Sequence, residues 1–126
     1  MPCLLLVDDD DNLRTTIADA LEDNGFDVVQ ASGGEAAFLA ASNAHFDVIL
    51  SDIDMQHGTG FWLLQKLRSS SNATPFVFMS GNILHSREAL VQLGANDFLQ
   101  KPFTVKALLS RLGAVVNSAK VNQAVG

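Results

Sequence analysis

The sequence has little of what builds covalent cross-links or membrane spans. Only one of its 126 residues, Cys3, is a cysteine, so no disulfide can form within the chain. It has no run of about 18 apolar residues, the length that a membrane-spanning helix requires. Its first residues lack the positive charge of a signal peptide. These absences predict a cytoplasmic protein that does not insert into membranes.

Positive charge is also scarce. Eight Lys and Arg residues are scattered singly among 14 acidic residues, which gives a net charge of −6. A nucleic-acid surface needs clustered cations to neutralise phosphates, so direct nucleic-acid binding is not expected. The acidic charge, in contrast, is concentrated in four consecutive aspartates at 8–11.

The composition that remains is that of a globular chain with one core. Apolar residues make up 48% and charged residues 17%, and no low-complexity tract or sequence repeat interrupts them. The length suits a single domain, which we place at residues 1–117. Residues 118–126 are small and polar, and they are predicted to form a flexible tail or the start of a linker.

Short apolar runs alternate with amphipathic stretches along the chain. The runs predict five strands, at 3–7, 26–31, 48–52, 76–79 and 97–100. Five helices follow them: one that Asn24 and Gly25 end, one over 35–43, one marked by Leu63, Leu64 and Leu67, one over 83–93, and one from 105 to 116. Such alternation predicts right-handed crossovers and a doubly wound α/β fold with a parallel sheet. The second strand is the most polar and is predicted to lie at an edge.

Polar side chains follow four of the five predicted strands. The first strand leads to Asp8 and Asp9, the third to Asp52, the fourth to Ser80 and the fifth to Lys101. Because the carboxyl ends of parallel strands share one edge of the sheet, these groups are expected to converge there.

This set of groups has the chemistry that aspartyl phosphorylation needs. Adjacent carboxylates repel one another unless a cation lies among them, and Mg²⁺ or Mn²⁺ suits oxygen ligands. A carboxylate such as Asp52 can then act as the nucleophile toward a phosphoryl group. The Lys101 ammonium and the Ser80 hydroxyl can each interact with a phosphoryl oxygen.

The combined motifs resemble the receiver domain of two-component response regulators, over about residues 3 to 117. The resemblance rests on Val7-Asp8-Asp9, Ser51-Asp52-x-x-Met55 with Gly60, Met79-Ser80-Gly81 and Lys101-Pro102-Phe103. It implies a flavodoxin-like sheet of five parallel strands in the order 2-1-3-4-5, with five helices. The sequence departs from the usual family pattern at Gln56, where proline is common, and at Phe98, where tyrosine is common.

The resemblance also implies a role for each site residue. Asp52 would be the phosphoacceptor and a metal ligand, Asp9 a direct ligand, and Asp8 a ligand through water. The backbone carbonyl of Asp54 would be a further ligand. Lys101 would bind the phosphoryl group, with a cis bond to Pro102. Ser80 and Phe98 would be the switch residues, and Asp54 and Asn82 would tune the lifetime of the phosphoryl group.

By the same resemblance, the phosphoryl donor would be a histidine kinase or a histidine phosphotransfer domain. A downstream protein would bind the face formed by the fourth helix, the fifth strand and the fifth helix. The domain would catalyse only its own phosphorylation and dephosphorylation.

Three alternatives remain at this point. One is a haloacid-dehalogenase-like phosphatase that uses Asp52 as nucleophile and Asp54 as acid/base. The second is a receiver module excised from a hybrid histidine kinase. The third is a binding module that keeps the fold without accepting phosphate.

Overall fold

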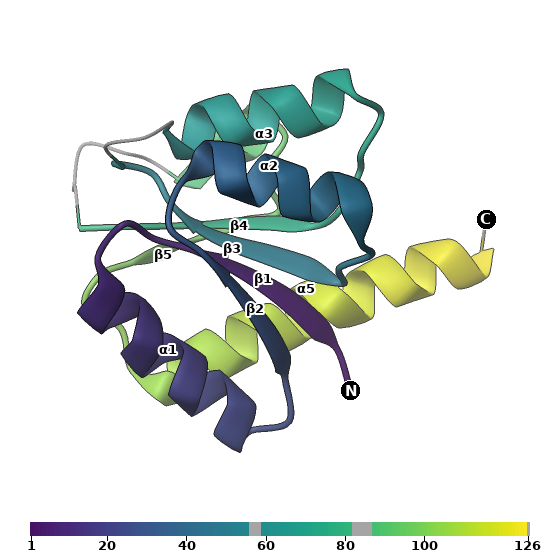
Figure 1. Cartoon of the computed structure of the whole chain (residues 1–126). Helices are drawn as coiled ribbons and strands as arrows, with labels where there is room; N and C mark the ends of the chain where they lie inside the picture. Colours follow the sequence, from purple (N-terminus) through teal and green to yellow (C-terminus); the bar gives the residue numbers. More distant parts are fainter. Residues whose placement is uncertain (56–58, 82–86, 126) are drawn as a thin grey trace.

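The computed structural model describes residues 1–55, 59–81 and 87–125 of the chain, which form one parallel five-stranded sheet with helices on both faces (Figure 1). The strands are β1 (Cys3–Val7), β2 (Asp27–Ala31), β3 (Val48–Asp52), β4 (Phe76–Ser80) and β5 (Asp97–Gln100). The helices are α1 (Asp11–Asp23), α2 (Gly34–Asn43), α3 (Gly60–Ser69), α4 (Arg87–Gln92) and α5 (Val105–Val125). The strand order is β2-β1-β3-β4-β5, so the predicted fold and strand order are confirmed.

The burial of each strand follows its place in the sheet. Every residue of β3 and β4 is buried, as expected for apolar runs that are covered on both faces. β2 is largely exposed and lies at an edge, which confirms the prediction from its polar sequence. None of the described helices is both long and apolar enough to span a bilayer.

The sheet separates two hydrophobic cores. On one face, side chains that include Leu5 and Ile49 pack with residues of α2, α3 and α4. On the other face, Leu6 and Leu50 pack with residues of α1 and α5. Because strand residues alternate in direction, neighbours such as Leu5 and Leu6 belong to different cores. Figure 1 shows α2 and α3 on one side of the strands and α1 and α5 on the other.

Side chains fix the starts of α1 and α3 and the loops that precede β4 and β5. Asp10 is the N-cap of α1 and accepts a hydrogen bond from the Leu13 N–H (3.1 Å). Thr59 caps α3 in the same way through the Trp62 N–H (3.1 Å). The Arg68 guanidinium, near the end of α3, donates to the carbonyls of Asn72 (3.0 Å), Thr74 (2.9 Å) and Gly94 (3.0 Å). Arg68 therefore joins the loops that precede β4 and β5.

Two helices differ from their predicted bounds. α5 continues to Val125, beyond the end predicted near residue 116, because residues 114–125 contain neither glycine nor proline. The described part of α4 begins at Arg87, and its predicted start at Ile83 lies outside the described residues. The assignment of residues 118–126 to a tail or linker stays a prediction.

Candidate functional site

The strand register brings the predicted site residues to one edge of the sheet. Val7 of β1 pairs with Ser51 of β3, so Asp8 and Asp52, the next residues along the two strands, lie side by side. Asp52 pairs with Met79, next to Ser80, and Ser80 pairs with Gln100, next to Lys101. The Lys101 N–H donates to the Ser80 carbonyl (2.8 Å). The predicted convergence of these strand ends is thereby confirmed.

Three carboxylates form a tight cluster at this edge. One oxygen from each of Asp8, Asp9 and Asp52 lies within 4.8 Å of the others. Asp8 is fully buried and Asp52 is 8% exposed. The Asp8 carboxylate accepts a hydrogen bond from the Asp10 N–H (3.0 Å), which fixes its orientation.

The Lys101 ammonium lies among these carboxylates. Its Nζ is 3.3 Å from Asp8 Oδ2 and 3.4 Å from Asp52 Oδ2. The Lys101-Pro102 peptide bond is cis, as the resemblance implied. Burial raises the pKa of the Asp52 carboxyl, the Lys101 charge partly opposes that rise, and the Asp8 charge adds to it.

The charge of the cluster matches a divalent cation. The Lys101 ammonium contacts Asp8 and Asp52, and its one positive charge does not balance three carboxylates when all three are ionised. A hard cation that prefers oxygen ligands, such as Mg²⁺ or Mn²⁺, would neutralise that excess. The donor set therefore suits the predicted metal. Asp54, two residues after Asp52, is exposed, and Asn82 and Gln56 lie outside the described residues.

Gly60 allows α3 to begin directly against the phosphoacceptor candidate. Its N–H donates to the Ile53 carbonyl (2.9 Å). A Cβ atom at residue 60 would lie 2.5 Å from the Asp52 carbonyl oxygen, which is closer than real Cβ contacts allow. Gly60 is part of the sequence motif, but its contact with Asp52 could not be predicted from the sequence, because that contact joins the start of α3 to the end of β3.

Arg14 is a supporting residue that the sequence analysis missed. Its guanidinium donates to the Asp8 carbonyl (2.7 Å) and to the Gln30 side chain (3.1 Å), and it pairs with Asp11 at 2.7 Å. It thus links α1 and β2 to the backbone of the acidic cluster. The spacing of Arg14 from Asp11, three residues along a helix, was the available signal.

The two predicted switch residues occupy neighbouring strands. Ser80 is 1% exposed at the end of β4. Phe98 is half-buried on β5, opposite Phe78, and packs against the core that β4 shares with α3 and α4. The Asp97 carboxylate accepts from the Phe98 N–H (2.8 Å) and from Arg111 of α5 (3.0 Å to each oxygen). The strand that carries Phe98 is therefore tied to α5.

Comparisons with known proteins give one consistent result. The response regulator receiver domain family matches residues 4–113. The chain is 34% identical over 122 residues to the transcriptional regulatory protein CiaR of Streptococcus pneumoniae, covering 95% of this chain and 54% of CiaR. It is 35% identical over 133 residues to the transcriptional regulatory protein PrrA of Mycobacterium leprae, covering 99% of this chain and 57% of PrrA. The chain thus spans about half the length of these curated relatives.

Solved structures agree with the sequence relatives. The receiver domain of the Francisella response regulator 1452 has a TM-score of 0.88 and 30% identity, covering 94% of this chain and 99% of that one. The chemotaxis response regulator CheY4 of Vibrio cholerae has a TM-score of 0.82 and 34% identity, covering 91% and 98%.

Proposed function

This chain belongs to the response regulator receiver domain family of two-component systems, and from that premise we propose that Asp52 accepts a phosphoryl group in a metal-dependent reaction. The observation that carries the proposal is the position of the Lys101 ammonium. It lies 3.4 Å from the Asp52 carboxylate, in a site where Asp8 and Asp9 supply further oxygen ligands.

In the proposed reaction, an Asp52 carboxylate oxygen attacks the phosphorus of a phosphohistidine. The P–N bond breaks, and the donor imidazole leaves with the bonding electron pair and takes up a proton. The donor is a histidine kinase or a histidine phosphotransfer domain. Lys101 and the Ser80 hydroxyl interact with phosphoryl oxygens, so charge is neutralised where it develops.

Asp9, Asp52 and the Asp54 carbonyl would hold Mg²⁺ or Mn²⁺ directly, and Asp8 would hold it through water. When bound, the metal shields the negative charge of the incoming phosphoryl group. The buried position of Asp8 and its bond from the Asp10 N–H keep this carboxylate oriented toward the site. Asp54 and Asn82 are proposed to set the lifetime of the product. The domain would act enzymatically only on its own phosphorylation and dephosphorylation.

We further propose that phosphorylation repacks the face formed by α4, β5 and α5. A phosphoryl group that binds the Ser80 hydroxyl better in one conformation than in another shifts the balance between them, and Phe98 then repacks beside β4. The exposed apolar side chain of Val91, on α4, supports its use by a downstream protein. The names of the relatives CiaR and PrrA suggest an output in transcription, in which this chain would not itself contact nucleic acid. Cytoplasmic location stays a prediction.

The test is phosphoryl transfer with Mg²⁺ present, from acetyl phosphate and from candidate histidine kinases. We expect stoichiometric labelling of the chain and none of Asp52→Ala. Asp54→Ala is the matched control, because it removes an exposed carboxylate two residues away but keeps the backbone carbonyl. It should still be labelled, with an altered lifetime. Labelling of Asp52→Ala would refute the proposal, and repeated turnover of a small phosphate ester would favour the dehalogenase-like alternative.

A further inference from the structure

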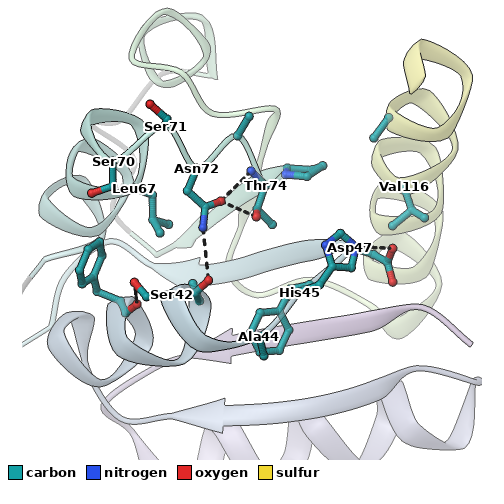
Figure 2. Close-up of a pocket in the computed structure, with 16 residues that line it drawn as sticks. Ser42, Ala44, His45, Asp47, Leu67, Ser70, Ser71, Asn72, Thr74 and Val116 are labelled. Atoms are coloured by element: carbon teal, nitrogen blue, oxygen red, sulfur yellow. Dashed lines mark hydrogen bonds and ion pairs between the residues drawn. The ribbon is translucent and has the colours of Figure 1, made fainter. Parts of the chain in front are cut away.

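The edge of the sheet opposite the acidic cluster carries a cavity of about 560 Å³ (Figure 2). It is lined by the C-terminal ends of α2 and α3, by the loops that follow these helices, and by Val116 and Ala119 of α5. Asp47 lies in its wall just before β3, whereas Asp52 ends that strand. Its volume is in the range of small-molecule sites.

The electrostatics of the cavity favour a cation. α2 and α3 both end there, so the negative ends of their dipoles face it. Lys66 and Arg68 in the last turn of α3 offset the charge at its end, whereas α2 has no basic residue in its last turn, so the uncompensated negative end is that of α2. Among the described residues that line the cavity, Asp47 is the one carboxylate, His45 is the one histidine, and none is Lys or Arg.

The Asp47 carboxylate is held in place at one oxygen and weakly paired at the other. Its Oδ2 accepts a hydrogen bond from the Cys3 N–H at 2.7 Å, which fixes its orientation. Its Oδ1 lies 3.6 Å from Nε2 of His45, whose side chain is 80% exposed. That distance exceeds a good hydrogen bond, so a stronger donor can displace the imidazole.

The rest of the wall is preformed and partly apolar. Figure 2 shows the Asn72 amide between α2 and the loop before β4. Its Nδ2 donates to the Ala41 carbonyl (3.3 Å), and its Oδ1 accepts from the N–H (3.0 Å) and hydroxyl (2.6 Å) of Thr74. Apolar side chains that line the cavity are Phe38, Phe46, Leu67 and Val116. They suit an aliphatic stem beside the charged group.

We propose that this cavity binds a guanidinium or ammonium group on a short apolar stem, with Asp47 Oδ1 as its ionic partner. An anion is disfavoured, because it would meet the Asp47 carboxylate and the uncompensated C-terminus of α2. The same chemistry can come from a free amine or from an Arg or Lys side chain of another polypeptide. The inference does not depend on phosphorylation of Asp52.

The test is an NMR titration of the ¹⁵N-labelled chain with n-butylguanidinium chloride, with n-butylurea as the neutral isostere, at constant ionic strength. We expect saturable shifts at the amides of Asp47, Asn72 and Val116, and binding of n-butylurea at least about tenfold weaker. Asp47→Asn should lower the affinity for n-butylguanidinium by about tenfold. Asp19→Asn, which removes an exposed carboxylate on α1, should not change it.

A second variant keeps the test decisive if Asp47→Asn does not fold. Ala119→Leu narrows the cavity from α5 without altering Asp47, and it should weaken binding. A blocked arginine amide distinguishes the two sources of the cationic group. If it binds more tightly than n-butylguanidinium, the ligand is a side chain of another polypeptide; if it binds more weakly, the ligand is a free amine. Equal binding of n-butylurea, or guanidinium-induced shifts confined to the Asp8–Asp9–Asp52 edge, would overturn the proposal.

Discussion

The same substitution, glycine to alanine, is predicted to have opposite effects at Gly60 and Gly113. At residue 60, the added Cβ would lie 2.5 Å from the Asp52 carbonyl oxygen, 3.0 Å from Phe78 Cε1 and 3.1 Å from Ile53 Cα. Two of these three atoms belong to the backbone and cannot rotate away. At residue 113, within α5, no heavy atom of the described structure other than the adjoining residues and backbone of the same helix lies within 4 Å of the new Cβ.

The magnitudes follow from these contacts. Overpacking costs about 1–3 kcal/mol, so Gly60→Ala should lower the free energy of unfolding by about 2 kcal/mol. Gly113→Ala meets no obstacle and should raise it by about 0.5–1 kcal/mol, because glycine is a poor helix former. With a urea m-value of about 2 kcal/mol/M, the unfolding midpoint should fall by about 1 M for Gly60→Ala. It should rise by roughly 0.3–0.5 M for Gly113→Ala.

Urea titrations followed by circular dichroism measure both variants under identical conditions. The acetyl phosphate reaction supplies a second measurement: Gly60→Ala should label more slowly, since α3 must move away from Asp52, and Gly113→Ala should label at the normal rate. If Gly60→Ala proved as stable as the unmodified chain, α3 would not begin against the Asp52 carbonyl as described.

Three further predictions concern charge and metal. Because burial raises the pKa of Asp52, the metal-free folded state binds a proton at this carboxyl more tightly than the unfolded chain does, so the Asp52 contribution to stability should increase as the pH falls toward the ordinary aspartate pKa of about 4. Subtracting the pH profile of Asp52→Asn, measured by urea titration, isolates this contribution, and a contribution that decreases as the pH falls would contradict the prediction. Mg²⁺ at ten times its dissociation constant should raise the free energy of unfolding by about 1.4 kcal/mol in a urea titration. Asp9→Asn should abolish most of this increase, and an unchanged increase would exclude Asp9 as a ligand. Arg68→Met should lower the free energy of unfolding by about 2–3 kcal/mol, because three backbone carbonyls lose a charged donor. Lys66→Met on the same helix should lower it by at most about 1 kcal/mol, because this exposed side chain loses only its contact over the Phe38 ring.

Most of the fold could be predicted because each element carries its own periodic signal. The runs at Val48–Leu50 and Phe76–Met79 are continuous, as buried parallel strands require, and both strands are buried. The strand order came from the resemblance, since periodicity does not order strands. The helical pattern of α5 ends near Val116, yet the helix continues to Val125, because nothing in the polar stretch that follows stops a helix.

The acidic site could be predicted because a parallel sheet brings the carboxyl ends of its strands together. The strand order alone was therefore enough to predict that four residues lie near one another: Asp8, Asp9, Asp52 and Lys101. The hydrogen bonds of Arg14 and the contact of Gly60 could not be predicted, because they depend on how far particular atoms reach between elements. The cavity beside Asp47 could not be predicted for a similar reason, because its walls come from the ends of α2 and α3 and from α5, which are distant in sequence.

The ion pair between Asp97 and Arg111 has a mechanical consequence. β5 begins with Asp97, which holds α5, and is followed by Lys101, which contacts the carboxylates. α5 extends past the sheet to Val125 (Figure 1), and at 1.5 Å per residue the part after residue 116 is about 13 Å long. From Arg111 to Val125 the helix is about 21 Å long, so a tilt of about 10° where Arg111 is anchored would displace the far end by roughly 4 Å. Small adjustments around Lys101 would thus become measurable as a displacement at the opposite end of the molecule.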